Sequence, residues 1–337
     1  MRTRLDHTFA RLLALLTLVC LLTSRIMLLL HEFGGHGATA TLLGGHITDW
    51  NLFLFAGGRV AYAYPDRGIA IAGRVLVSMG GIGLEVVLGA LAFVVARRRR
   101  ARPALRFSLF AVGTVLLGHG TLYLARGVHY GFGDGALVAW LLGAQRWPIV
   151  GAASALAIAT AFHGGRRLAR LAVPSLGRGG WAAIQLMIVF LCAGAIHGGL
   201  ALAEVTFFPD TRWAAIMEDA SLVRARADLA RRVAEAEQRG EALNEAERRR
   251  ILEATERARR PFPLDPWLAA SVLLALGAGV IRGVRSVERS APGRPDGTDA
   301  PDAPDARPEW RTVGLLFCGL AVALGAILVL RLLRPAH

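Results

Sequence analysis

The sequence contains no lysine, only three cysteines in 337 residues and few aromatic residues, 7% of the chain. The net charge of +14 therefore comes from arginine alone, and the arginine runs border apolar segments, where they set membrane orientation rather than bind nucleic acid. Cys20, Cys192 and Cys318 lie in three separate apolar segments. Their separation excludes a cysteine-based metal motif and indicates inert packing residues.

Apolar residues are abundant instead, at 54% of the chain with a mean hydropathy of +0.45. Segments this long and apolar predict an all-α polytopic membrane protein with about seven transmembrane helices. The first apolar segment follows a short basic start but lacks a convincing cleavage site, so we expect it to be retained. The predicted spans are 8–30 (continuing helically through about 43), 70–96, 104–125, 135–163 with a break near Trp147, 181–203, 266–282 and 312–331.

Three segments between the spans have a different character. Residues 45–68 alternate apolar and polar positions around Gly57 and Gly58, which predicts a small β-hairpin at the membrane edge near the first span. Residues 206–263 are rich in Glu, Arg and Ala, and predict a charged helical hairpin outside the membrane that is either a solvated structure or a partner-binding surface. Residues 286–310 are rich in Pro and Asp and predict a disordered linker.

The arginines also predict an orientation. Three groups of arginines fall on the side of the N-terminus: those at 97–102, those of a predicted loop with Arg166, Arg167 and Arg170, and those at 282–285. Because arginines near span ends favour the cytoplasm, this side should be cytoplasmic. We therefore expect a multi-pass protein of the bacterial cytoplasmic (inner) membrane. The same count places residues 31–36 and Asp134 near the opposite face.

The motif HEFGGH at residues 31–36 ends the first apolar run. Two imidazoles on one helix can bind zinc, and the adjacent Glu32 can take a proton from water. Ionisable residues inside a membrane span are functional candidates because they are costly to bury. The alternative is a hydrogen-bonded cluster at a span terminus, with the glycines serving helix packing.

The five-residue spacing of the histidines makes a structural demand. Successive residues of an α-helix turn by about 100°, so His31 and His36 would diverge by about 140° in a regular helix. A π-bulge or a helix break at Gly34 and Gly35 would bring them together. A permuted site, with Glu32 and His36 as ligands on one face, is the alternative in a regular helix.

Three motifs together resemble the site-2 protease family of intramembrane zinc metalloproteases. LLLHEFGGHGATATLLGGHITDW (28–50) resembles the first active-site helix, SMGGIGLEVVLGA (78–90) the glycine-rich helix that packs against it, and GFGDGALVAWLLG (131–143) the motif that supplies an aspartate ligand. Glu85 stands where the family often has asparagine. The resemblance covers residues 26–145.

This resemblance implies that Zn²⁺ is bound by His31, His36 and Asp134, with Glu32 as general base. Asp134 could equally cap the helix that begins at Gly135. Three further side chains could orient a metal ligand: Glu85, His119 and His129. Either His119 or His129 could instead replace Asp134 as the third ligand, or be an ordinary hydrogen-bonded histidine.

The implied organisation is a metalloprotease-like membrane core at 1–148, additional transmembrane helices at 149–205, the charged hairpin at 206–263 and C-terminal transmembrane helices at 264–337. We expect a zinc metalloendopeptidase that cleaves a membrane protein or peptide within or next to the bilayer and binds no nucleic acid. The alternatives are a catalytically inactive membrane scaffold that binds a client protein, and a zinc hydrolase acting on a lipid-soluble, non-peptide substrate.

Overall fold

The computed structural model describes residues 2–65, 69–98, 103–176, 180–207, 263–289 and 310–333. Apart from their ends, the predicted charged hairpin at 206–263 and the predicted linker at 286–310 lie outside the described residues. The last helix before that linker continues through Arg289, so the linker prediction began four residues too early.

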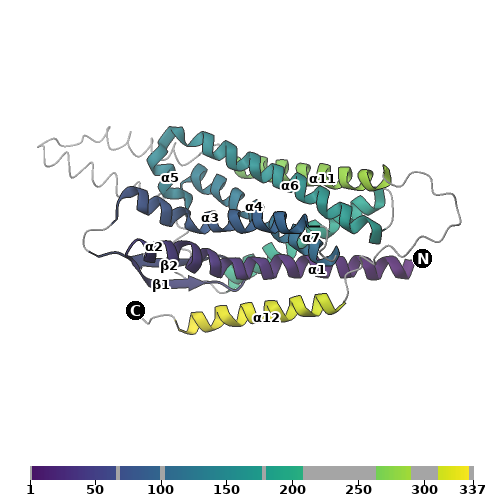
Figure 1. Cartoon of the computed structure of the whole chain (residues 1–337), viewed down its shortest axis with the longest axis horizontal. Helices are drawn as coiled ribbons and strands as arrows, with labels where there is room; N and C mark the ends of the chain where they lie inside the picture. The colour runs from purple at the N-terminus through teal and green to yellow at the C-terminus, as the bar shows by residue number, and fades with distance from the viewer. Residues whose placement is uncertain are drawn as a thin grey trace, which may run out of the picture.

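Within the described residues, seven helices are long and apolar enough to cross a membrane. This confirms the prediction of an all-α polytopic fold with a small two-stranded sheet (Figure 1). The spanning elements are α1 (Arg2–Leu29, extended by the π-helix η1, Leu30–Gly37, and by α2, Ala38–Leu42), α3 (Ile71–Ala96), α4 (Pro103–Tyr130), α6 (Trp147–Leu176), α7 (Gly180–Phe207), α11 (Leu264–Arg289) and α12 (Trp310–Leu332).

The fourth predicted span, 135–163, was wrong in its boundaries. A short helix α5 (Gly135–Leu142) stops at Gly143, whose φ of +50° lies outside the right-handed helical region. One 3₁₀ turn, η2 (Gly143–Arg146), leads into α6, which begins at the predicted break. The spanning helix therefore runs from Trp147 to Leu176.

The same correction moves three arginines that were predicted to lie in a loop. Arg166, Arg167 and Arg170 lie within α6. They are tolerated there because the buried stripe of α6, which includes Leu168, packs against its neighbours while the arginines occupy other faces. They lie on the C-terminal half of α6, and this helix runs from the α5 end of the bundle toward the end where the N-terminus lies (Figure 1).

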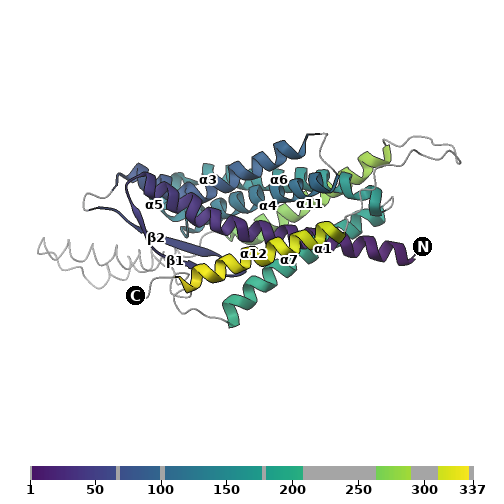
Figure 2. The same ribbon diagram turned by 60° about the horizontal axis from the view of Figure 1, so that its bottom comes forward.

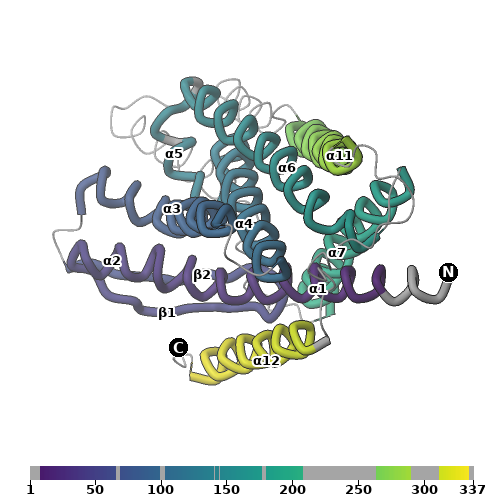
Figure 3. Tube along the Cα trace, turned by 45° about the vertical axis from the view of Figure 1, so that its right-hand side comes forward, coloured from purple at the N-terminus to yellow at the C-terminus, as the bar shows by residue number. Residues whose placement is uncertain are grey.

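The helices pack through small residues and leucine-rich contacts. Gly279 and Gly283 of α11 lie directly against the backbone of Phe162 and Arg166 on α6, and Figure 3 shows these two helices side by side. On the other side of the bundle α12 lies along α1. The main core joins α1, α3, α4, α6, α7 and α11. It includes Leu12, Leu15, Leu16, Val19, Ala96, Phe107, Phe110, Leu168 and Leu186.

The predicted hairpin consists of β1 (His46–Leu52) and β2 (Gly58–Ala63), which pair antiparallel with Trp50 opposite Val60. It lies at the end of the bundle away from the N-terminus, beneath η1 and beside α12 (Figures 1 and 2). The indole Nε1 of Trp50 donates a 2.9 Å hydrogen bond to the carbonyl of Leu330, which joins β1 to α12.

A buried carboxylate from α7 holds the hairpin turn. Glu204 accepts hydrogen bonds from the consecutive backbone amides of Leu54, Phe55 and Ala56 at 2.6, 2.6 and 3.0 Å. The carboxylate also lies 3.6 Å from the guanidinium of Arg331 on α12. Because an amide left unpaired in a buried turn is costly, this contact fixes the turn against α7.

A second buried charge, on α1, reaches the same turn from the other side. Arg25 is 3% exposed and donates hydrogen bonds to the carbonyls of Phe53 and Ala56 at 3.2 and 2.9 Å. The turn therefore receives an acidic side chain at its amides and a basic one at its carbonyls. The two tethers fix the hairpin relative to α1, which carries the histidines.

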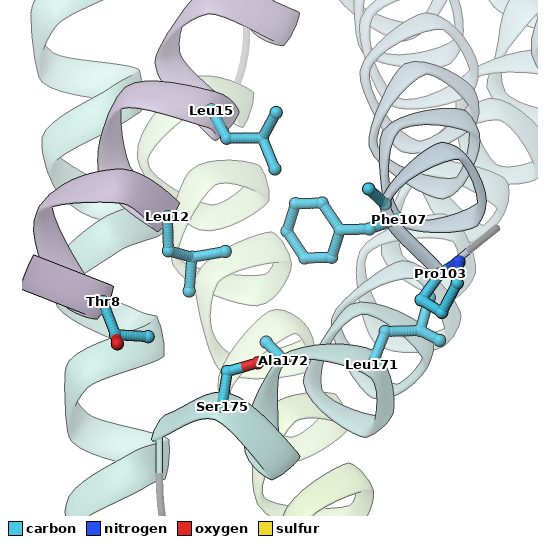
Figure 4. Close-up of a pocket in the computed structure, with 9 residues that line it drawn as sticks. Thr8, Leu12, Leu15, Pro103, Phe107, Leu171, Ala172 and Ser175 are labelled. Atoms are coloured by element: carbon cyan, nitrogen blue, oxygen red, sulfur yellow. The ribbon is translucent and has the colours of Figure 1, made fainter. Parts of the chain in front are cut away.

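The opposite end of the bundle contains a small apolar cavity of about 20 Å³ between α1, α4 and α6. Figure 4 shows leucine, alanine and phenylalanine side chains facing it, with Thr8 and Ser175 at its edge. A space of this size holds about one water molecule. None of the described residues that line it is acidic, a histidine or a cysteine.

Candidate metal centre

The HEFGGH segment forms a π-helix. Residues Leu30–Gly37 follow α1 without interruption, and the chain returns to α-helix at Ala38. In a π-helix backbone hydrogen bonds join residues five apart, so residues i and i+5 come to lie over one another. The structure therefore meets the geometric demand that the five-residue spacing of His31 and His36 imposed.

The two imidazoles converge with Asp134 from the loop before α5. The Nε2 atoms of His31 and His36 are 3.1 Å apart. Asp134 places Oδ2 2.9 Å from the first and Oδ1 3.2 Å from the second. His31 and His36 are each 7% exposed, so three ionisable groups meet in a nearly dry site. These three side chains, the triad below, could hold a metal ion.

The other ring nitrogens fix which atoms face the triad. His36 Nδ1 lies 2.6 Å from the carbonyl oxygen of Val77, and because a carbonyl can only accept, this nitrogen must carry the proton. His31 Nδ1 lies 2.9 Å from Oε1 of Glu85 and can donate to that carboxylate in the same way. With both Nδ1 atoms protonated, the neutral rings turn bare Nε2 lone pairs toward each other and toward Asp134.

This convergence of acceptors indicates a cation site. Two imidazole lone pairs and a carboxylate repel one another at these distances unless a proton or a metal ion lies between them. Four-coordinate zinc with bonds of about 2.0–2.1 Å needs its ligand atoms about 3.3 Å apart. The 3.1 Å between the two Nε2 atoms and the 3.2 Å from His36 Nε2 to Oδ1 of Asp134 are close to that edge length, while the 2.9 Å from His31 Nε2 is to the other carboxylate oxygen, Oδ2. The spacing of the triad is therefore compatible with a bound metal ion.

Two glycines with positive φ deliver Asp134 to the site. Gly131 and Gly133, with φ of +71° and +51°, turn the chain sharply between α4 and α5. Ser78 of α3 donates a 2.7 Å hydrogen bond to the carbonyl of Asp134, which fixes its backbone. The Asp134 side chain makes no capping hydrogen bond to α5, so its contacts are with the histidines.

The electrostatics of Asp134 follow from these contacts. Burial alone would raise the pKa of the Asp134 carboxyl. When protons rather than a metal ion lie on the Nε2 atoms, hydrogen bonds from the protonated His31 and His36 outweigh burial and lower the pKa from 3.8 to about 2. The side chain therefore stays ionised over the physiological range. An ionised carboxylate is the form that ligates a metal ion.

Close packing of glycines lets α3 approach the π-helix. A side chain at Gly81 would collide with the imidazole of His31, and one at Gly35 would collide with the backbone of Gly80 and Gly81. The GG pairs at 34–35 and 80–81 thus face each other across the α3–η1 contact. This packing brings Val77 and Glu85, four residues either side of Gly81, to the two histidines.

Glu32 is buried beside the triad but does not belong to it. The side chain is 6% exposed, and its carboxylate takes a backbone hydrogen bond from Val60 of β2. Its charge still interacts with those of His31, His36 and Asp134. Glu32 and His36 do not form the permuted ligand pair, since His31 and His36 converge instead.

The remaining residues singled out in the sequence separate into two groups. Glu85 joins His31 to His119, whose Nδ1 lies 2.8 Å from Oε2 of Glu85 while its side chain is 63% exposed. His129 lies elsewhere: its buried ring packs against Tyr130 and Trp147, at 4.5 and 5.1 Å between centroids.

Sequence reasoning missed Tyr123. Its ring stacks on His119 and meets His31 edge to face, with centroids 5.9 and 6.2 Å away, and its hydroxyl bonds to the backbone of Asp134. Its spacing from His119, four residues along α4, was the available signal, because side chains at i and i+4 share a helix face. The carbonyl of Val77 had no sequence signal at all.

The chain has no recognised relatives in the comparisons with known proteins. No family model matches it, and no curated protein and no solved structure matches it.

Proposed function

We propose that the protein is a membrane-embedded zinc metallopeptidase that hydrolyses peptide bonds within or next to the bilayer. The observation that carries this proposal is the π-helix, which turns His31 and His36 toward Asp134. In a regular helix the two imidazoles would point apart, and His31, His36 and Asp134 could not form one ligand set. The resemblance of the three motifs to the site-2 protease family supports the same reaction class.

Each residue of the site has a role in this proposal. His31, His36 and Asp134 would hold zinc, which when bound would polarise the scissile carbonyl and lower the pKa of water. Glu32 accepts a proton from the attacking water and returns it to the leaving amine. The backbone hydrogen bond from Val60 keeps the Glu32 carboxylate in place. Val77 and Glu85 orient the two imidazoles.

The hairpin gives the substrate a place to extend. Val60 of β2 lies opposite Trp50 of β1. The backbone amide of Val60 donates to Glu32 of η1. The edge of β2 that is not paired with β1 therefore faces the site. An extended peptide can add to such an edge through main-chain hydrogen bonds. We propose a membrane protein or peptide as substrate, in the bacterial cytoplasmic membrane, with the site toward the face opposite the arginine-rich ends.

The test is zinc content together with cleavage. Detergent-purified wild type is compared with His31→Ala, Glu32→Gln and the matched control His163→Ala, whose exposed ring lies on α6. We expect about one zinc per chain in wild type, Glu32→Gln and His163→Ala, and much less in His31→Ala. Cleavage of a model transmembrane substrate should be lost in His31→Ala and Glu32→Gln, and kept in His163→Ala.

The outcomes separate the alternatives. A folded wild type without stoichiometric zinc would refute every hydrolase hypothesis for this triad. Stoichiometric zinc without any turnover that depends on Glu32 would instead support an inactive scaffold that binds a client protein. Turnover of a lipid-soluble, non-peptide ester or amide but of no peptide would leave the zinc site standing and change the substrate class.

A further inference from the structure

A second, larger cavity of about 340 Å³ opens beside the triad. Its walls come from three places: the end of β2 and the residues after it, the first turns of α3, and the start of α5. Sites for small ligands or peptide side chains begin at about 300 Å³, so this cavity has room for one or two substrate side chains.

The cavity and the triad share backbone. Ser78 lines the cavity and donates its hydroxyl to the carbonyl of Asp134, and Gly133, also in the lining, precedes that ligand in the chain. Val77, the neighbour of Ser78, holds His36. A substrate whose scissile carbonyl lies at the triad therefore has residues within reach of the cavity.

The polar groups that line the cavity are donors. Among the described residues that line the cavity, Arg74 is the only charged one and none carries a carboxylate. Tyr62 and Tyr64 add two hydroxyls. Burial raises the pKa of Tyr62, and the nearby Tyr64 and Asp134 raise it further. Burial also raises the pKa of Tyr64, although Arg74 partly offsets this. Both hydroxyls therefore stay protonated, and the arginine offers five N–H donors.

Two observations point to an occupant that is not part of the described chain. Among the described residues, the buried hydroxyl of Tyr64 has no hydrogen-bond partner and Arg74 has no carboxylate within salt-bridge distance. Arg74 also lies in the first turn of α3, where the helix dipole disfavours a cation and favours an anion. Helix stability thus does not account for an arginine at this position.

We propose that this cavity is a specificity subsite that binds an acidic side chain, aspartate or glutamate, of the peptide substrate, with Arg74 pairing the carboxylate and Tyr62 and Tyr64 donating to it. The inference rests on the proposed peptidase function and deepens it, because it names the feature that marks a substrate. A free C-terminal carboxylate has the same chemistry, and the experiment distinguishes the two.

The experiment measures binding apart from cleavage. Zinc-loaded, full-length Glu32→Gln protein in detergent is titrated with fluorescent peptides amidated at the C-terminus, in which a single aspartate is moved along an otherwise neutral sequence. Each peptide has an asparagine twin, and one neutral peptide has a free C-terminal carboxylate. A partly exposed ion pair predicts that aspartate at one position binds up to about fivefold tighter than asparagine.

Variants of Arg74 then assign the preference to the cavity. In the Glu32→Gln background, Arg74→Gln should abolish the preference for aspartate, and Arg74→Glu should favour a lysine peptide instead. The control Arg59→Gln removes an arginine of β2 that pairs with Asp49 and does not line the cavity, and it should keep the preference. The free-carboxylate peptide should show no gain over its amidated twin.

Four results would overturn the subsite. The first is equal binding of the aspartate and asparagine twins at every position, and the second is a preference for aspartate that survives Arg74→Gln. The third is tight binding of the free-carboxylate peptide alone. The fourth is found by measuring retention of the protein on anionic phospholipid vesicles: Arg74→Gln changes that retention but no peptide affinity. The proposed function fails by a different result: absence of turnover of every peptide by zinc-loaded wild type, whatever the binding pattern in Glu32→Gln.

Discussion

The carboxylate of Glu85 lies 2.9 Å from Nδ1 of His31, on the side of the ring opposite the Asp134 carboxylate. The imidazole is thus held between two carboxylates, one on each nitrogen. Glu85 is 2% exposed, and its second oxygen faces His119. A carboxylate in this position fixes the tautomer of a ligating histidine and increases its basicity.

Substitution Glu85→Gln should therefore weaken zinc binding about 10–100-fold, because the amide removes the charge that supports His31. His119→Ala removes only the outer partner of Glu85 and should have a smaller effect. Competition with a chromophoric chelator at fixed pH measures both affinities. Equal affinities in wild type and Glu85→Gln would mean that the Glu85 contact serves packing alone.

Gly81→Ala should displace His31, since the added methyl meets the imidazole itself. We expect loss of most bound zinc and a cost of about 1–3 kcal/mol in the free energy of unfolding. Gly83→Ala is the matched control on the same helix, with nothing within 4 Å of the added carbon. Zinc content and thermal unfolding in detergent report both effects, and identical behaviour of the two variants would contradict the close approach of α3 to η1.

Zinc binding should itself stabilise the folded state. At a free zinc concentration about 100-fold above the dissociation constant, the gain is about 2.7 kcal/mol. Asp134→Asn should lose most of this gain because it removes the anionic ligand, whereas Asp265→Asn should keep it, since Asp265 pairs with Arg126 on the surface. Thermal unfolding with and without zinc, after treatment with a chelator, measures the difference; a zinc-induced shift that persists in Asp134→Asn would exclude this aspartate as a ligand.

Glu204→Gln should loosen the hairpin turn. The amide can accept through one oxygen only, and its NH₂ group would face backbone donors that now bond to a carboxylate. The expected cost is about 1–3 kcal/mol, with faster hydrogen exchange at Leu54, Phe55 and Ala56. Glu288→Gln, on the exposed end of α11, should change neither quantity. Unchanged exchange in Glu204→Gln would show that the turn holds without the carboxylate.

The sequence was sufficient to predict the membrane helices. It also predicted that His31 and His36 converge only if the helix bulges or breaks at Gly34 and Gly35. Both predictions depend on hydropathy and residue spacing, which are local properties. The boundaries of α6 could not be obtained in this way. The sequence indicated a break near Trp147, but it gave no signal that the backbone turn at Gly143, with φ of +50°, makes Gly135–Leu142 a separate short helix.

Contacts between distant segments were beyond sequence reasoning for another reason. Glu85 stands out in an apolar helix, yet only the packing of Gly35 against Gly81 brings it to His31. Glu204 was not singled out at all, because its partners are backbone amides that every sequence contains. Side chains whose partners are main-chain atoms, such as Glu204 and Arg25, leave no complementary residue to be found.

The π-helix also limits the structural change that the five-residue spacing in HEFGGH requires to one short segment of the helix. In a continuous α-helix one added residue would rotate every following residue by about 100°. The wider turn of Leu30–Gly37 takes up that residue, and the chain re-enters α-helix at Ala38. Gly37 then meets Ile47 of β1, so the hairpin keeps its place under the helix. The five-residue spacing of the histidines is thus accommodated within one π-helical segment, and the helix that follows it is regular.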